Sequence, residues 1–352
     1  MKSKKSFQVF GLGSVGLFLA TQLINNHQRV LGFDPRIDEE NNLKFSYTSP
    51  FGSHQCNLIV QPELTSKVDV LVVCTKSYSL ESRLLQFLAN ANKPTIFVQN
   101  GLSHVSLISK YFEDPIFCSL SSLQCRFVED SLTVSSNVSA LNLGATKISE
   151  QFLEDDYLKL AFQSPSLNVE YSDDIEYLLS SKLARWLPLS IICCFTQKPL
   201  GEALNEFSKH ELTDGVLAIC NFLNSRNFQK FVPSDVLAQL NALPSELLPS
   251  SIHDYTLKKT TEAEVELDYI LSQSQGLDFD TSVLKLWAKC FGNKIACLIK
   301  RLTRLAGKTM RPRWVGIHMV EIWGHCLNRL GTHWRACSVI EIRTHTFRLM
   351  AD

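Results

Sequence analysis

A glycine turn between an apolar strand and an apolar helix constrains the fold of this chain more than any other feature. Residues 7–10 form a short β-prone run, and residues 17–23 repeat apolar side chains at helical spacing. In such a turn one glycine allows a tight bend, a second lets a pyrophosphate approach the backbone, and a third allows close helix packing. The turn therefore predicts a dinucleotide-binding site formed by Gly11, Leu12, Gly13, Ser14, Val15 and Gly16.

A second apolar strand, residues 30–33, leads to an acidic residue that bears on cofactor choice. Asp34 lies 23 residues after Gly11, where a dinucleotide fold places the carboxylate that accepts the ribose 2′-hydroxyl of NAD. Arg36 could instead hold the 2′-phosphate of NADP, and Asp34 could merely cap the turn before Pro35. The residues alone leave the choice between NAD and NADP open.

Two more apolar strands end in polar residues. Residues 68–74 precede Lys76, and residues 95–98 precede Asn100. Continuous apolar runs are typical of strands buried on both faces of a parallel sheet. Ligands of such sheets bind outside the carboxyl ends of the strands, so we expect Lys76 and Asn100 where cofactor and substrate meet.

The pattern changes to helical spacing from about Asp173. A chain of 352 residues is long enough for two domains. We therefore predict an α/β amino-terminal Rossmann-type dinucleotide-binding domain over residues 1–172 and an all-α carboxy-terminal domain over residues 173–293. Residues 294–352 form a basic tail of uncertain structure.

Composition excludes several classes of protein. The 35 basic residues balance the 35 acidic ones, so no global field attracts nucleic acid. The hydrophobic content of 45% argues against disorder, and no segment reads as a membrane span. The 11 cysteines form no CxxC pair, which favours reduced thiols and no bound metal. We expect a cytoplasmic protein with no membrane or nucleic-acid partner.

The tail differs from the rest of the chain. Residues 294–352 hold eleven basic and three acidic residues. Residues 311–314 mix arginine and tryptophan as nucleic-acid or membrane-surface patches do, although basic tails are usually only solvated. Four residues of the tail could suggest a zinc site: His325, Cys326, His333 and Cys337. Their spacing matches no standard pattern of zinc ligands. A shifted reading frame or an appended foreign sequence would produce the same change in composition.

The order of the motifs resembles the ketopantoate reductase family (2-dehydropantoate 2-reductases). These are NADPH-dependent enzymes with a Rossmann domain and a helical domain. The family pattern has a GxGxxG turn, a Lys-x-Tyr segment, an Asn-Gly strand end, a Lys-Leu pair and a Ser-rich helix start followed by Asp and Thr-Glu. All five occur here in that order over roughly residues 7–290.

The resemblance implies the catalytic residues. Lys182 and Leu183 are similar to the family's catalytic pair, so Lys182 would be the general acid. Glu262 is the first choice for the active-site carboxylate. Glu266 is the second choice, because matching it to the family's motif requires a larger gap in the alignment. Without the resemblance, both carboxylates read as part of a solvated acidic helix face.

The resemblance also implies a substrate pocket, and here the chain departs from the family. Trp186 and Ser190 stand where the family has two asparagines that line the pocket. Either Ser250 or Ser251 matches the family's substrate-binding serine. The substrate-binding candidates are Asn100, Ser190, Ser250 and Ser251.

The implied activity is NADPH-dependent reduction of a small 2-oxo acid by hydride transfer. The resemblance implies 2-dehydropantoate (ketopantoate) as the substrate and pantoate as the product. This reaction belongs to pantothenate and coenzyme A biosynthesis. NADPH/NADP is the expected cofactor, NAD stays an alternative, and a homodimer is left open. Two other hypotheses remain: a degenerate, non-catalytic dinucleotide-binding relative, and a related opine-type dehydrogenase.

Overall fold

The computed structural model describes residues 4–292 except for residues 66, 146–155 and 227–229. The basic patch and the zinc hypothesis of the tail lie outside the described residues. The chain divides into two compact units, Met1–Lys289 and Cys290–Asp352. The sheet, the helices around it and every candidate site residue belong to the first unit.

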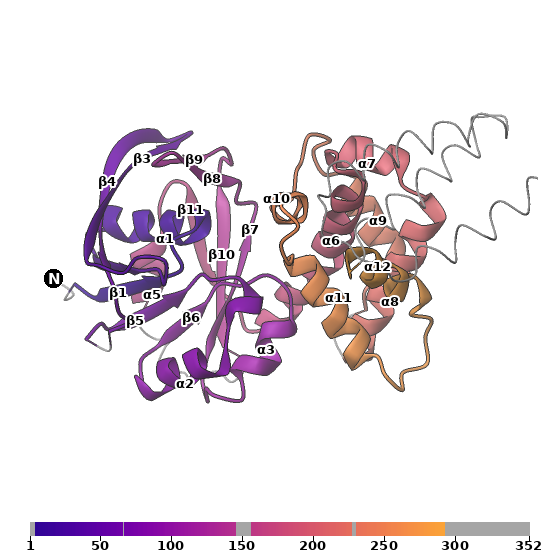
Figure 1. Ribbon diagram of the computed structural model, residues 1–352, viewed down its shortest axis with the longest axis horizontal. Helices are drawn as coiled ribbons and strands as arrows, with labels where there is room; N and C mark the ends of the chain where they lie inside the picture. The colour runs from indigo at the N-terminus through magenta and orange to yellow at the C-terminus, as the bar shows by residue number, and fades with distance from the viewer. Residues whose placement is uncertain (1–3, 66, 146–155, 227–229, 293–352) are drawn as a thin grey trace, which may run out of the picture. The chain divides into compact units, whose positions relative to one another are not determined.

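One sheet of eleven strands organises the first half of the chain (Figure 1). Its strand order is β11-β10-β7-β6-β5-β1-β2-β4-β3-β9-β8. The six strands from β7 to β4 in that order run parallel, as a dinucleotide-binding sheet requires. The strands are β1 (Ser6–Phe10), β2 (Arg29–Phe33), β3 (Asn41–Ser49), β4 (Gly52–Gln61), β5 (Val70–Val73), β6 (Thr95–Phe97), β7 (Ile116–Ser121), β8 (Cys125–Val128), β9 (Ser131–Val134), β10 (Ser139–Ala145) and β11 (Leu167–Tyr171).

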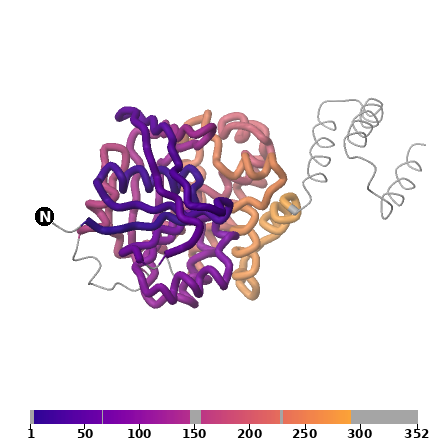
Figure 2. Tube along the Cα trace, turned by 60° about the vertical axis from the view of Figure 1, so that its left-hand side comes forward, coloured from indigo at the N-terminus to yellow at the C-terminus, as the bar shows by residue number. Residues whose placement is uncertain are grey.

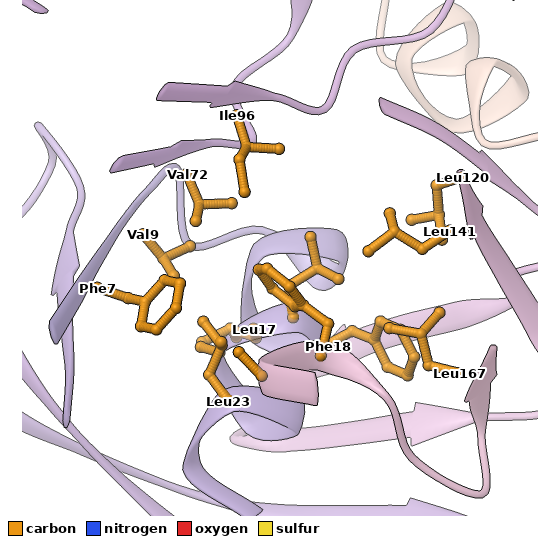
Figure 3. Packing of buried hydrophobic residues seen from close by; sticks show 14 of the residues in the cluster. Phe7, Val9, Leu17, Phe18, Leu23, Val72, Ile96, Leu120, Leu141 and Leu167 are labelled. Atoms are coloured by element: carbon orange, nitrogen blue, oxygen red, sulfur yellow. The ribbon is translucent and has the colours of Figure 1, made fainter. Parts of the chain in front are cut away.

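Four helices and one 3-10 turn accompany this sheet. They are α1 (Ser14–Asn25), η1 (Ser77–Ser79), α2 (Ser82–Asn90), α3 (Ser103–Ile108) and α5 (Tyr157–Phe162). Figure 3 shows Phe7 and Val9 of β1 beside Leu17 of α1. All three side chains are fully buried, so α1 is fixed against the sheet by apolar packing immediately after the glycine turn.

After β11 every described element is a helix. The helices are α6 (Ile175–Thr196), α7 (Leu200–Glu206), α8 (Lys209–Ser225), α9 (Pro233–Asn241), α10 (Ser251–Thr256), α11 (Glu262–Gln273) and α12 (Ser282–Gly292). In Figure 2 the colour of the trace passes from the indigo and magenta of the strands to the orange of the later helices. The prediction of a Rossmann-type domain followed by an all-α region is confirmed.

Helix α6 is the central element of the helical region. It packs against α7, α8, α9, α10 and α11, and its amino-terminal part also contacts β7 and β10. The Asp174 side chain accepts a hydrogen bond from Tyr177 N at 2.9 Å and so caps the start of the helix. The helix continues through Pro188, and Cys193 and Cys194 are buried in it.

By length and composition alone, α6 could also cross a membrane. Among the described residues it is the one helix that meets both criteria. Its most apolar window is 72% buried inside the protein. Burial by five neighbouring helices accounts for its apolar sequence without a bilayer.

Candidate functional site

The glycine turn forms an open cradle at the amino terminus of α1. Gly11 has φ +91°, and a Cβ atom there would lie 2.9 Å from Thr75 N. A Cβ at Gly16 would collide with the Gly11 carbonyl oxygen. At Gly13, by contrast, a Cβ would meet nothing within 4 Å, so the backbone faces open space. The turn therefore needs two glycines for packing and leaves the third free for a ligand to approach.

Helix α1 begins at this open glycine without a capping side chain and without an acidic residue in its first turn. The first amide groups of a helix have no acceptor within the helix and carry partial positive charge, which suits a diphosphate. Leu12 is buried and Val15 is partly buried, so these two support the turn by packing. Ser14 Oγ accepts a hydrogen bond from Phe127 N at 3.0 Å, which ties β8 to the start of α1.

The carboxyl end of β5 adds a polar group to the cradle. The Thr75 hydroxyl is buried and has no hydrogen-bond partner among the described residues. Gln99 donates from Nε2 to the carbonyl oxygens of Val73 at 2.9 Å and Thr75 at 3.0 Å, and so holds the ends of β5 and β6 together. Open glycine, uncapped helix and unpartnered hydroxyl together fit a dinucleotide cofactor.

Asp34 and Arg36, the two candidates for the ribose site, form an ion pair. Arg36 donates from Nε and Nη2 to the Asp34 carboxylate at 2.7 and 2.6 Å, and Leu12 N donates to it at 3.2 Å. Burial raises the pKa of Asp34, but the hydrogen bonds and charge of Arg36 outweigh burial and hold this pKa below its usual value. The Asp34 side chain is only 4% exposed, whereas that of Arg36 is 77% exposed. The guanidinium is thus the accessible partner.

Four predicted residues meet in one hydrogen-bonded chain where the sheet contacts the helices. Lys76 Nζ lies 3.0 Å from Glu262 Oε2, and Asn100 Nδ2 donates to the same oxygen at 3.2 Å. Lys182 Nζ donates to Asn100 Oδ1 at 2.6 Å and also to the carbonyl oxygen of Leu120. Lys76 and Asn100 follow strands β5 and β6, while Lys182 and Glu262 come from α6 and α11. The Asn100 amide therefore joins an ammonium to a carboxylate.

The two lysines of this chain differ in their electrostatic surroundings. Burial lowers the pKa of Lys182 below its usual value. Burial also lowers the pKa of Lys76, but the carboxylates of Glu262 and Asp254 outweigh it and raise this pKa above the usual value. Lys182 is therefore the lysine suited to giving up a proton, and Lys76 stays charged.

The two candidate carboxylates, one turn apart on α11, have different partners. Glu266 accepts hydrogen bonds from Leu102 N at 2.9 Å, Ser103 N at 3.1 Å and the Ser103 hydroxyl. Burial raises the pKa of Glu266 to about 7. Glu266 thus holds the loop after Asn100, and Glu262 is the carboxylate that contacts both Lys76 and Asn100.

The three candidate serines lie in different surroundings. Ser250 is exposed and precedes α10, one turn before Asp254, whose carboxylate lies 3.6 Å from Lys76 Nζ. Ser251 and Ser190 are buried, and neither hydroxyl has a hydrogen-bond partner among the described residues. Ser250 is therefore on the side of α10 that faces Lys76, whereas Ser251 and Ser190 do not join the hydrogen-bonded chain.

Sequence reasoning did not include three groups as part of the site. Asp254 is the acidic residue that follows the Ser-rich helix start, and its carboxylate lies 3.6 Å from Lys76 Nζ. The Leu120 carbonyl accepts from Lys182, and no side-chain signal in the sequence could have indicated a main-chain group. Arg185 lies one helical turn from Lys182, and its charge was overlooked. Among the described residues, no three His, Cys, Asp or Glu side chains gather as metal ligands would.

Comparison with known proteins supports the resemblance stated from the motifs. Residues 7–149 match the family model for ketopantoate reductase PanE/ApbA. No curated protein sequence matches the chain. The resemblance to ketopantoate reductases is thus confirmed by a family model for residues 7–149, which hold most of the sheet.

Solved structures share the fold at low sequence identity. A D-mandelate dehydrogenase in complex with NADH and anilino(oxo)acetate is 16% identical, with a TM-score of 0.70 over 82% of this chain and 98% of that one. The 2-dehydropantoate 2-reductase of Geobacter metallireducens is 15% identical, with a TM-score of 0.68 over 82% and 99%. A dimeric ketopantoate reductase of Staphylococcus aureus is 16% identical, with a TM-score of 0.65 over 84% and 99%. The fold therefore extends through the helical region.

Proposed function

We propose that this protein is a reductase that converts a 2-oxo acid to the 2-hydroxy acid with a reduced nicotinamide dinucleotide. The observation that carries the proposal is the partly buried Lys182 ammonium, joined through Asn100 to Glu262. A lysine whose pKa is lowered by burial has the property that a general acid needs near neutral pH. The family model and the structural neighbours, which are oxidoreductases by name, support the same chemistry.

A reduced nicotinamide held by the cradle would supply a hydride to the substrate carbonyl carbon. Lys182 donates the proton to the carbonyl oxygen, so the C=O group becomes a hydroxyl. Asn100 holds the Lys182 ammonium in place through Oδ1, and Glu262 fixes the orientation of the Asn100 amide. Lys76 pairs with Glu262 at 3.0 Å and so holds this carboxylate in place. Ser250, at the start of α10, would give the substrate a hydrogen bond.

We propose NADPH as the cofactor, with its diphosphate at the amino terminus of α1. The accessible Arg36 guanidinium supports this choice because it can turn from Asp34 to a 2′-phosphate. The Asp34 carboxylate, bonded to Leu12 N, remains as the competing feature that suits an NADH ribose hydroxyl. The protein is thus expected to accept both cofactors and to prefer NADPH.

The test is cofactor oxidation, followed by absorbance, with a panel of 2-oxo acids that begins with 2-dehydropantoate. A titration of NADPH and NADH on the same sample measures binding separately. Turnover with at least one panel member is the expected result. NADPH binding without turnover of any 2-oxo acid would contradict the proposal and favour a non-catalytic dinucleotide-binding protein. Turnover that requires an amino acid as a second substrate would favour an opine-type dehydrogenase.

A further inference from the structure

The face of α6 that carries Lys182 also presents two other partly buried residues. Arg185 and Trp186 follow Lys182 by three and four positions, so they lie on either side of it one turn along the helix. The other residues of this turn, Leu183, Ala184 and Leu187, are buried in the helical core. Lys182 is therefore flanked by a guanidinium on one side and by an indole on the other.

Among the described residues, the Arg185 guanidinium has no carboxylate partner. Its Nε donates to the carbonyl oxygen of Ser181 at 3.3 Å, so the side chain runs back toward the turn that holds Lys182. In the part of the chain that the structure describes, it forms no salt bridge. Its charge contributes to lowering the pKa of Lys182, after the larger effect of burial. A partly buried, unpaired guanidinium is well suited to bind a carboxylate through two parallel hydrogen bonds.

The carboxylates around Lys76 disfavour an anion. There, Glu262 and Asp254 share the single ammonium of Lys76 at 3.0 and 3.6 Å. A substrate carboxylate placed beside these two carboxylates would meet net repulsion. Near Arg185 the substrate carboxylate would meet two cations, Lys182 and Arg185. Among the described residues, no carboxylate pairs with Arg185 and competes with the substrate. The electrostatics therefore orient a 2-oxo acid with its carboxylate toward Arg185 and its carbonyl oxygen at Lys182.

On the flank of Lys182 away from Arg185, α6 carries the indole of Trp186. Trp186 is partly buried, and helical side chains lean toward the preceding turn, which here is the turn that carries Lys182. Ser190, one turn further on, is fully buried and does not offer its hydroxyl at the surface. A substrate side chain on this flank would contact an indole ring and would lack an amide or hydroxyl partner.

We infer that Arg185 binds the substrate carboxylate and that Trp186 packs against the substrate side chain, so the preferred substrates are 2-oxo acids with a branched or aromatic apolar side chain. This inference rests on the proposed reductase function. It adds a charged binding residue and a specificity residue to the site. It also predicts that a hydroxyl on the substrate side chain lowers the efficiency of reduction.

The first experiment tests Arg185 with a length-matched neutral variant, Arg185→Met, and a charge-preserving variant, Arg185→Lys. We expect Arg185→Met to raise KM for 3,3-dimethyl-2-oxobutanoate by about 10- to 100-fold, with a smaller change in kcat. A loss of this size corresponds to one charge-assisted hydrogen-bonded pair between the guanidinium and the substrate carboxylate. Arg185→Lys restores part of the loss. The control is Arg83→Met, which removes an exposed arginine on α2 and should leave KM unchanged.

A binding measurement separates this role from an effect on turnover. Calorimetric titration of 3,3-dimethyl-2-oxobutanoate into the protein loaded with NADP⁺ measures affinity in a complex that cannot react. Arg185→Met should weaken this affinity by the same factor as it raises KM, and more than Ser250→Ala does. Unchanged affinity and KM in Arg185→Met, with turnover intact, would overturn the role of Arg185 while leaving the reductase function in place.

The second experiment tests Trp186 with two substrates that differ by one hydroxyl group. These are 3,3-dimethyl-2-oxobutanoate and its 4-hydroxy derivative, 2-dehydropantoate. An apolar pocket disfavours an added hydroxyl by up to about 100-fold, whereas a site built to hydrogen-bond that hydroxyl favours it by about 10⁴-fold. We expect the wild-type kcat/KM to be higher for the deoxy acid and Trp186→Asn to shift the ratio toward 2-dehydropantoate. Trp186→Phe should preserve the wild-type preference.

The outcomes distinguish this inference from the function on which it rests. A wild-type preference for 2-dehydropantoate would overturn the apolar substrate class and keep the reductase. Absence of binding and turnover for every 2-oxo acid would overturn both.

Discussion

Lys182 and Lys76 lie in one hydrogen-bonded chain, yet their surroundings favour opposite protonation behaviour. Lys182 has neutral acceptors, the Asn100 amide and the Leu120 carbonyl, and burial lowers its pKa. Lys76 has two carboxylates nearby, which raise its pKa. The neutral partners of Lys182 thus suit a proton donor, whereas the carboxylate partners of Lys76 keep it charged.

The first prediction concerns the charge of Glu262. This carboxylate favours the protonated form of Lys182, so Glu262→Gln should lower the pKa of Lys182 further. Because a general acid works only while protonated, the alkaline loss of kcat/KM should move to lower pH. The pH dependence of kcat/KM measures this shift. Glu202→Gln, which changes an exposed carboxylate on α7, is the control, and equal profiles for both variants would contradict the role of Glu262.

The second prediction concerns cofactor choice. Arg36→Ala removes the accessible guanidinium and leaves the buried Asp34 carboxylate free to accept ribose hydroxyls. We expect affinity for NADPH to fall by about 10-fold or more while affinity for NADH stays equal or improves. Titration of both cofactors gives the two dissociation constants. An equal loss for both would show that Arg36 does not read the 2′-phosphate.

At the level of elements, α11 connects the helical region to the loop that carries Asn100. Glu266 accepts both backbone amides at the start of α3, and a Cβ at Gly101 would collide with its carboxyl group. Tyr269, one turn later, lies 3.2 Å from the Ser106 hydroxyl. The position of Asn100 therefore depends on how α11 packs against α3.

The third prediction follows from the buried carboxyl of Glu266. Its pKa of about 7 in the folded protein exceeds the value of about 4.3 in an unfolded chain. Between these values the folded state binds more protons, so the free energy of unfolding that this group contributes is lost as pH rises toward and past 7. The thermal midpoint of the wild type should fall relative to that of Glu266→Gln between about pH 5 and pH 8. A difference that stays constant with pH would contradict this account.

The elements could be predicted where the sequence has local periodicity, but the site needed tertiary contacts. The glycine turn, the strands before Lys76 and Asn100, and α6 follow from short-range patterns. Glu262 and Glu266 share a helix face, and only the amides of Leu102 and Ser103 distinguish them. The exposure of Ser250 and the burial of Ser251 likewise depend on the packing of α10 against α6. Adjacent positions on a helix can be told apart only when the neighbouring helix is known.

At the scale of the whole molecule, all candidate site residues lie in the unit Met1–Lys289, and the compositionally distinct segment 294–352 follows it. The fourth prediction is that a chain ending after Gly292 keeps its NADPH affinity, its kcat/KM and its thermal midpoint. Parallel measurements on the full and shortened chains provide the test. Loss of turnover with an unchanged midpoint would assign part of the site to the tail.

The central claim is that Lys182 donates the proton in a 2-oxo acid reduction, and the most direct measurement compares the wild type with Lys182→Ala. With NADPH already bound, mixing with the best 2-oxo acid and following nicotinamide absorbance isolates the chemical step. We expect Lys182→Ala to slow this step by about 10²- to 10⁴-fold while NADPH affinity stays unchanged. Lys198→Ala, at a lysine paired on the surface with Glu202 and Glu206, should react as the wild type does. An undiminished rate in Lys182→Ala would contradict the account.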